Sequence, residues 1–106
     1  MNIVSGLIGD FLRKINAGIL EVPVPMILVH PNSQFATLTW WGDKGFFRID
    51  AIPTKFQFCF GVFKKDISYS LPRTVDLNNS IDGKEKEIFT IIEYGLKCIG
   101  VDVTKT

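Results

Sequence analysis

Hydrophobic residues near the start of the chain recur at the spacing of one helix face. Residues three and four apart lie on the same side of an α-helix, so this spacing predicts an amphipathic helix over residues 3–17. Gly18 follows it, and glycine commonly ends a helix because it adopts the left-handed conformation without strain. The apolar positions of this face are Ile3, Leu7, Ile8, Phe11, Leu12 and Ile15.

A second helix is predicted near the other end of the chain. Asp82 and Glu85 have the spacing of a capping box, in which an acidic side chain caps the helix and a glutamate stands at the third helical position. The helical pattern continues to about Cys98, Gly100 ends it, and Val101–Val103 is predicted as a last short strand. The apolar stripe of this helix consists of Ile88, Ile91, Ile92, Gly95, Leu96 and Ile99.

Between the helices, apolar and polar residues alternate with the period of two that is typical of β-strands. Pro23 and Pro25 mark residues 19–24 as an extended edge or linker, because proline cannot donate to a central ladder. After Pro72, residues 73–80 are predicted to form a polar connection. The predicted strands are Met26–His30, Gln34–Trp41, Phe46–Ile52, Lys55–Phe63 and Ile67–Leu71, and the turns between them include 31–33, 42–45 and 64–66.

This order of elements predicts an α+β fold. Consecutive strands joined by short loops favour an antiparallel sheet, here of four or five strands. The N-terminal and the C-terminal helix that flank it are sufficient to cover one face, which gives a two-layer architecture. A single domain over residues 1–106 is expected, because chains divide into domains only well beyond this length.

The composition of the chain argues against two classes of function, binding to duplex nucleic acid and insertion in a membrane. The net charge is +1, with 12 basic and 11 acidic residues spread over both halves of the chain, so the basic footprint of a protein that binds duplex nucleic acid is missing. No apolar run approaches the roughly 20 residues that span a bilayer, so no membrane span is expected. The first residues lack a basic n-region and a cleavage site, which predicts a cytoplasmic chain.

Candidate catalytic groups are few. His30 is the only histidine, and it stands at the end of a predicted strand beside a proline, where a structural role is typical. Cys59 and Cys98 belong to different elements, lack metal-ligand spacing, and are expected to be reduced and unpaired. No phosphate-binding, zinc-protease or nucleophile-elbow motif is present. We therefore expect no cofactor, no metal ion and no enzymatic activity.

The two adjacent tryptophans suggest a binding surface. Neighbouring strand residues point to opposite faces, so Trp40 and Trp41 cannot both enter one core. Trp41 shares its face with Thr37 and Thr39, which makes it the expected outward ring. An exposed aromatic patch on a small domain is typical of a binding surface, and tryptophan and arginine are its usual anchors.

We therefore expect a non-enzymatic module, of the inhibitor, immunity or adaptor type, that binds a protein partner through its sheet face or a hairpin. The residues expected at this surface are Phe35, Trp41, Phe46 and Arg48. A homodimer is also expected, because a symmetric dimer is the commonest way to cover such an aromatic surplus.

Phe56, Phe58 and Phe60 share one face of the most hydrophobic strand and are predicted to be core. Two alternatives to protein binding nevertheless remain open for the aromatic residues of the sheet. In the first alternative, a small apolar ligand binds in an aromatic pocket lined by Trp40, Phe58 and Phe60. In the second, the aromatic strands bind single-stranded nucleic acid weakly by stacking. The segment Lys44–Arg48 begins like the aromatic signature of an RNA-recognition strand but departs from it after the first aromatic residue.

Overall fold

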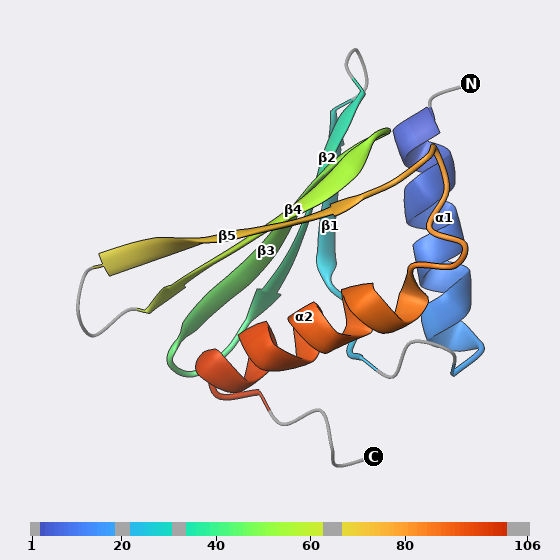
Figure 1. Cartoon of the computed structure of the whole chain (residues 1–106). Helices are drawn as coiled ribbons and strands as arrows, with labels where there is room; N and C mark the ends of the chain where they lie inside the picture. The colour runs from blue at the N-terminus through green and yellow to red at the C-terminus, as the bar shows by residue number, and fades with distance from the viewer. Residues whose placement is uncertain (1–2, 19–21, 31–33, 63–66, 102–106) are drawn as a thin grey trace.

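The computed structural model describes residues 3–18, 22–30, 34–62 and 67–101, with the backbone alone for residues 67–73. Two helices flank five strands along the chain (Figure 1). The elements are α1 (Ile3–Asn16), β1 (Met26–His30), β2 (Phe35–Trp41), β3 (Gly45–Ile52), β4 (Lys55–Val62), β5 (Ile67–Asp76) and α2 (Glu85–Cys98).

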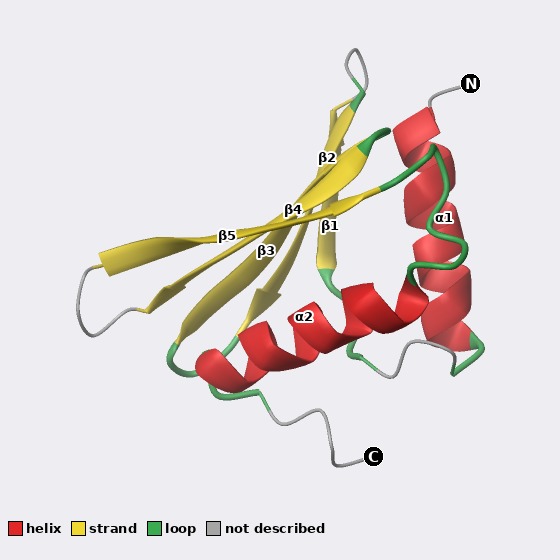
Figure 2. Cartoon of the chain, in the orientation of Figure 1, coloured by secondary structure: helices red, strands yellow, loops and turns green. Residues whose placement is uncertain are grey.

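The five strands form one antiparallel sheet in which each strand pairs with the next along the chain. A tight hairpin joins β2 to β3, where the Gly42 N–H donates to the Gly45 carbonyl at 2.9 Å. Both helices lie on the same side of the sheet, so the molecule has two layers (Figure 2). This confirms the predicted α+β architecture.

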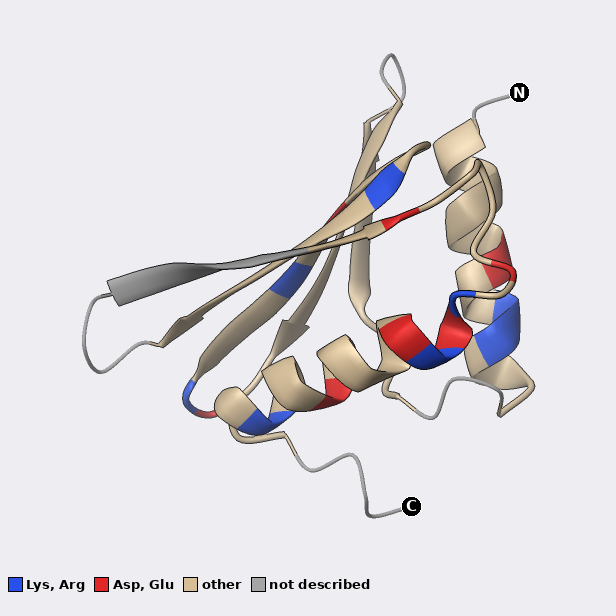
Figure 3. Ribbon diagram, in the orientation of Figure 1, with Lys and Arg blue, Asp and Glu red and all other residues tan. Residues whose placement is uncertain are grey.

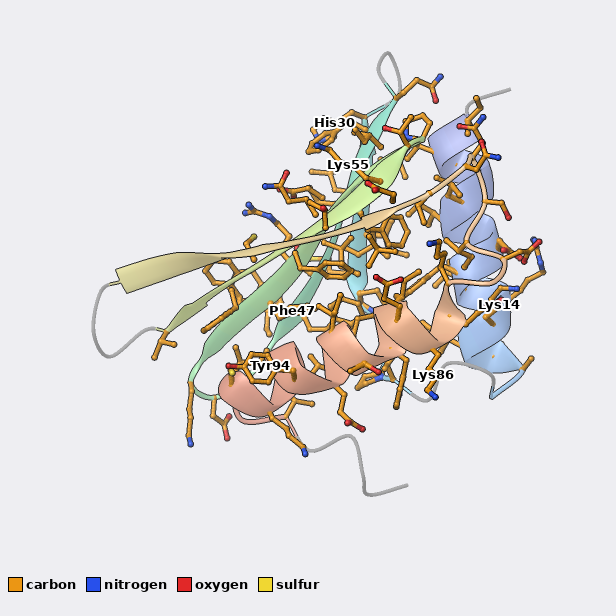
Figure 4. The ribbon with its side chains drawn as sticks, viewed as in Figure 1. Lys14, His30, Phe47, Lys55, Lys86 and Tyr94 are labelled. Carbon is orange, nitrogen blue, oxygen red and sulfur yellow. The ribbon has the colours of Figure 1, made fainter. Side chains whose placement is uncertain are left out.

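The core lies between the sheet and the two helices. Residues that alternate along β2, β3 and β4 are buried there, including Phe56 and Phe58, which have no exposed surface. Phe60 is partly buried against the same core. The prediction that this phenylalanine face packs under the helices is therefore confirmed. In Figure 4, Phe47 lies between the sheet and α2, whereas His30 and Lys55 lie at the end of the sheet away from α2.

Close packing of α2 on the sheet depends on one glycine. Gly95 belongs to the apolar stripe of α2, together with the buried Ile88, Ile91, Ile92 and Leu96. A Cβ atom at Gly95 would collide with the ring of Phe47 from β3. Because the position carries no side chain, the helix approaches the ring directly, and the large Phe47 fills the space that a side chain on α2 would otherwise occupy.

The start of α2 differs from the prediction. The helix begins at Glu85, and its N-cap residue Lys84 makes no side-chain capping hydrogen bond. A helix beginning after Asp82 would require Gly83 in the right-handed helical region, but Gly83 has φ +83°. The predicted capping box is therefore wrong, and Asp82 instead contributes to an ion cluster with α1.

The last strand also differs from the prediction. β5 runs to Asp76 without ending at Pro72, so residues 73–76, predicted as connection, belong to the sheet. Two features of the backbone allow a proline there. β5 is an edge strand, and its register with β4 shifts between Phe58 and Cys59, which leaves room for unpaired residues.

The structure also tests the predictions for segments outside the main helices and strands, where those segments are described. Residues 22–25 form no strand or helix, as expected for the segment with two prolines, and Gly18 has a left-handed φ of 77°. Val101 is not in a strand. The predictions for residues 19–21, 31–33, 63–66 and 102–103 lie outside the described residues.

An ion cluster connects the two helices where the last turn of α1 meets the start of α2 (Figure 3). The Lys14 ammonium lies 3.6 Å from an Asp10 carboxylate oxygen, 3.1 Å from one of Asp82 and 3.3 Å from one of Glu85. The hydrogen bond to Asp82 is the main reason why the pKa of Lys14 is raised. In turn, the hydrogen bond from Lys14 holds the pKa of Asp82 below its ordinary value. Backbone hydrogen bonds are the main reason why the pKa of Glu85 is also lowered.

Replacement of Lys14 by methionine should therefore destabilise the fold in a pH-dependent way. Folding lowers the pKa values of the Asp82 and Glu85 carboxyl groups. Their contribution to stability is therefore fully present above the unfolded-state pKa of about 4, and it is lost as the pH falls through the folded-state pKa values. The raised lysine pKa gives stability that is lost as the pH rises through its folded-state value. Thermal unfolding should show a lower Tm for Lys14→Met at pH 7 and little difference from the wild type at pH 3. An equal difference at both pH values would mean that the lysine stem acts by packing alone.

Candidate functional site: the open face of the sheet

The side of the sheet away from the helices is the candidate functional site, and we call it the open face. Neither helix lies on it (Figures 1 and 2). Residues directly opposite each other in an antiparallel pair share a face, so the strand register assigns its members. They are Met26, Leu28 and His30 of β1, Phe35, Thr37, Thr39 and Trp41 of β2, Phe46, Arg48, Asp50 and Ile52 of β3, Lys55, Gln57 and Cys59 of β4, and Thr74 and Asp76 of β5.

The β2–β3 hairpin carries an aromatic pair. Trp41 and Phe46 stand directly opposite each other, and their ring centroids are 5.8 Å apart. Trp41 is 59% exposed, whereas Trp40 is only 4% exposed and lies in the core. The alternation of the strand therefore places the two tryptophans on opposite faces, as predicted. The Phe46 ring therefore packs against the indole ring of Trp41 at the end of the hairpin.

A second apolar feature lies next to this pair, on β1. Met26 is 59% exposed and Leu28 is 57% exposed. In the register of β1 and β2, Met26 stands opposite Thr39 and Leu28 opposite Thr37, so both lie beside the strand that ends in Trp41. Large apolar side chains that lie exposed together on a small protein mark an interaction surface. Sequence reasoning missed these two residues, because it assigned no face to the first strand.

An arginine is held in the middle of the open face. The Arg48 Nε–H donates to Oδ1 of Asp50 at 2.9 Å, and Nη2–H donates to Oδ2 at 3.4 Å. The two residues are neighbours on one face of β3, so the carboxylate holds the guanidinium in place along the strand. The pair also balances its own charge, which leaves this part of the face polar but close to neutral.

Cys59 stands opposite Arg48 on the neighbouring strand. Burial raises the pKa of its thiol, and the nearby positive charge of Arg48 opposes this only in part. A buried thiol with a raised pKa contains little thiolate at neutral pH and reacts slowly. Both cysteines are unpaired, as predicted, and Cys98 is more exposed than Cys59.

These environments predict the outcome of thiol titration. The native protein should react with a thiol reagent in two phases, the faster from Cys98 and the slower from Cys59, because only exposed thiolate attacks the reagent. In denaturant, without reductant, the titration should count two thiols. A count of zero with an unchanged monomer mass would show a disulfide and would contradict the structure.

At the other end of the open face, His30 and Phe35 form a separate aromatic contact. They stand opposite each other, with ring centroids 4.9 Å apart. Phe35 begins β2 and Trp41 ends it, so the two lie roughly 20 Å apart at about 3.4 Å per residue. The structure thus places all four predicted site residues on one face, but only three of them, Trp41, Phe46 and Arg48, form one neighbourhood.

The alternative ligand site has a different environment. The Trp40 ring contacts Phe11 and Phe47, with centroids 6.4 Å and 5.7 Å away, and its indole N–H donates to the Pro23 carbonyl at 2.7 Å. The Phe58 ring is stacked on Phe47 at 6.1 Å. Other rings therefore occupy the space beside these two side chains, and Phe60 stands opposite Phe47 in the sheet. These contacts favour core packing over a ligand pocket.

Within the described residues, no group of three or more His, Cys, Asp and Glu side chains could hold a metal ion. In the same part of the chain, neither helix combines the length and the apolar character needed to cross a membrane. Comparisons with protein-family models, with curated proteins and with solved structures found no match to this chain.

Proposed function

We propose that the chain is a non-enzymatic binding module that holds a protein partner on the open face of its sheet. The observation that carries the proposal is the group formed by Trp41, Met26 and Leu28, each more than half exposed on the same face. Antiparallel sheets often have one solvated face, but that face is normally polar. Here three large, exposed apolar side chains interrupt that polar pattern.

The composition of the surface favours a protein over the alternatives. Buried centres of protein interfaces are enriched in tryptophan, methionine, phenylalanine and arginine. Trp41 and its neighbours Met26, Phe46 and Arg48 supply one residue of each type. Thr37, which is partly exposed beside them, supplies a hydroxyl group for the polar rim of such an interface, and the sheet backbone fixes the positions of all these residues before binding.

Charge on the open face does not favour nucleic acid. A single-strand binder places aromatic rings in a positively charged groove. On the open face, Arg48 is paired with Asp50, and Lys55 stands opposite Asp76 in the register of β4 and β5. Both of these cations therefore have an acidic neighbour, and a phosphate backbone would meet no net positive charge from the described residues of β3 and β4.

A charge placed in the centre of the open face tests the proposal. Thr37→Arg introduces a long cation between β1 and β3, where a partner would have to desolvate it, and should abolish capture of a partner from the native host. Thr90→Arg is the matched control, because Thr90 is exposed on α2, on the other side of the molecule. Loss of the same partner with both variants, or with Thr90→Arg alone, would place the binding surface elsewhere.

A further inference from the structure

The two edges of the sheet are built differently. β5 contains Pro72, which has no N–H to donate, and a register irregularity interrupts its pairing with β4. Natural edge strands are commonly protected in this way against pairing with another chain. β1, Met-Ile-Leu-Val-His, has no proline and no charged residue, and its pairing with β2 is regular over its whole length. The sheet thus has one protected edge and one unprotected edge.

Within the described residues, no strand pairs with the outer side of β1. Ile27 and Val29 point to the helix side of the sheet and pack against the core, yet both keep some exposed surface. Their neighbour in β2, Leu38, has none. On the opposite face, Met26 and Leu28 are more than half exposed. Apolar side chains therefore reach solvent along both faces of this edge.

We propose that β1 pairs with β1 of a second copy of the chain, antiparallel, to form one continuous sheet of ten strands. An antiparallel pair with two-fold symmetry has its axis perpendicular to the sheet, so directly opposite residues come from the same face. Overlap of the whole strand then places the axis at Leu28. Leu28 stands opposite Leu28 of the second copy, and Met26 stands opposite its His30.

Three features favour a second copy as the occupant. The edge has no Lys, Arg, Asp or Glu, so two copies approach without repulsion between such charges, and the register sets Leu28 against Leu28 and Ile27 against Val29. Two-fold dimers are the commonest closed assemblies, and this contact uses the unprotected edge of both copies. Because β5 is protected, the sheet does not extend beyond the dimer. The inference concerns the strand edge and not the ligand of the open face; Met26 and Leu28 belong to both surfaces, whereas Trp41 of β2 belongs to the open face alone.

Disulfide trapping tests the register directly. In a Cys59→Ser, Cys98→Ser background, Leu28→Cys should give a covalent dimer on mild oxidation, because opposite Cα atoms in an antiparallel pair are about 4.5–5.5 Å apart. Met26→Cys should not, because the two copies of that residue would be offset by four positions, roughly 13 Å along the strands. Met26→Cys combined with His30→Cys should again give the covalent dimer. Failure of Leu28→Cys to cross-link would overturn the register.

Light scattering and sedimentation then test the dimer itself. The wild type should be dimeric, and Leu28→Lys should raise the dimer dissociation constant by at least about tenfold, because it sets two cations against each other at the axis. Thr74→Lys, on the exposed face of the other edge strand, should leave it unchanged. A monomeric wild type, or a dimer insensitive to Leu28→Lys, would contradict the inference. Trp41→Ala should leave the dimer intact, which separates this result from the proposed function.

Discussion

Phe58→Ala should lower the free energy of unfolding by about 3–5 kcal/mol, the cost expected for removing a fully buried phenylalanine ring. Phe58 has no exposed surface and lies at the centre of an aromatic group, stacked on Phe47 and edge-on to Phe56. Its removal leaves a cavity between β4 and the helices that rigid neighbouring rings cannot fill. Since small domains are stable by only about 5–15 kcal/mol, urea denaturation should show a large fall in the transition midpoint.

Two other variants act as controls for this result. Phe60→Ala should cost less, because Phe60 is only partly buried at the margin of the core. Tyr94→Ala should cost close to nothing, because Tyr94 is 58% exposed on α2. A loss below about 1 kcal/mol for Phe58→Ala would mean that the ring is not in a packed core, and the two-layer arrangement would have to be revised.

Trp41→Ala should weaken binding of the partner by about 2 kcal/mol or more, roughly thirtyfold, with little change in the free energy of unfolding. The ring is more than half exposed in the isolated chain, so its removal leaves no cavity in the core. In a complex it would be desolvated next to Phe46 and close to Arg48. Calorimetric titration with the captured partner, together with denaturation of the variant alone, measures the two effects separately.

Tyr94→Ala is the matched control for this variant as well. Tyr94 and Trp41 have nearly equal exposed fractions, 58% and 59%, but lie on opposite layers of the molecule. Tyr94→Ala should leave the affinity unchanged. The reverse pattern, in which Trp41→Ala lowers the stability and leaves the affinity intact, would make Trp41 a structural residue and remove the main anchor from the proposed surface.

Much of the fold could be predicted from residue spacing because the strands are strictly alternating. In β4, three phenylalanines at every second position identify the core face without any tertiary information. The same alternation separates Trp40 from Trp41, and the structure places them on opposite faces. Short turns between consecutive strands then favour the antiparallel order. These are local signals, and each agrees with the global fold.

The differences come from interactions between distant parts of the chain. Local sequence rules predict that Pro72 ends a strand, but a strand at the edge with a register shift tolerates it. Asp82 matches a capping position by spacing, yet its partner Lys14 is 68 residues away in the sequence. Likewise, the exposure of Met26 and Leu28 follows from β1 being the edge strand, which single-strand patterns do not reveal.

The most direct test of the open face as the binding surface is site-specific photo-cross-linking in the native host. A photoreactive phenylalanine analogue replaces Trp41 in one variant and Tyr94 in another, so that two side chains of nearly equal exposure report on opposite sides of the molecule. The proposed function predicts that the analogue at position 41 cross-links one defined protein partner and that the analogue at position 94 does not. A defined partner cross-linked from position 94 and not from position 41 would contradict it.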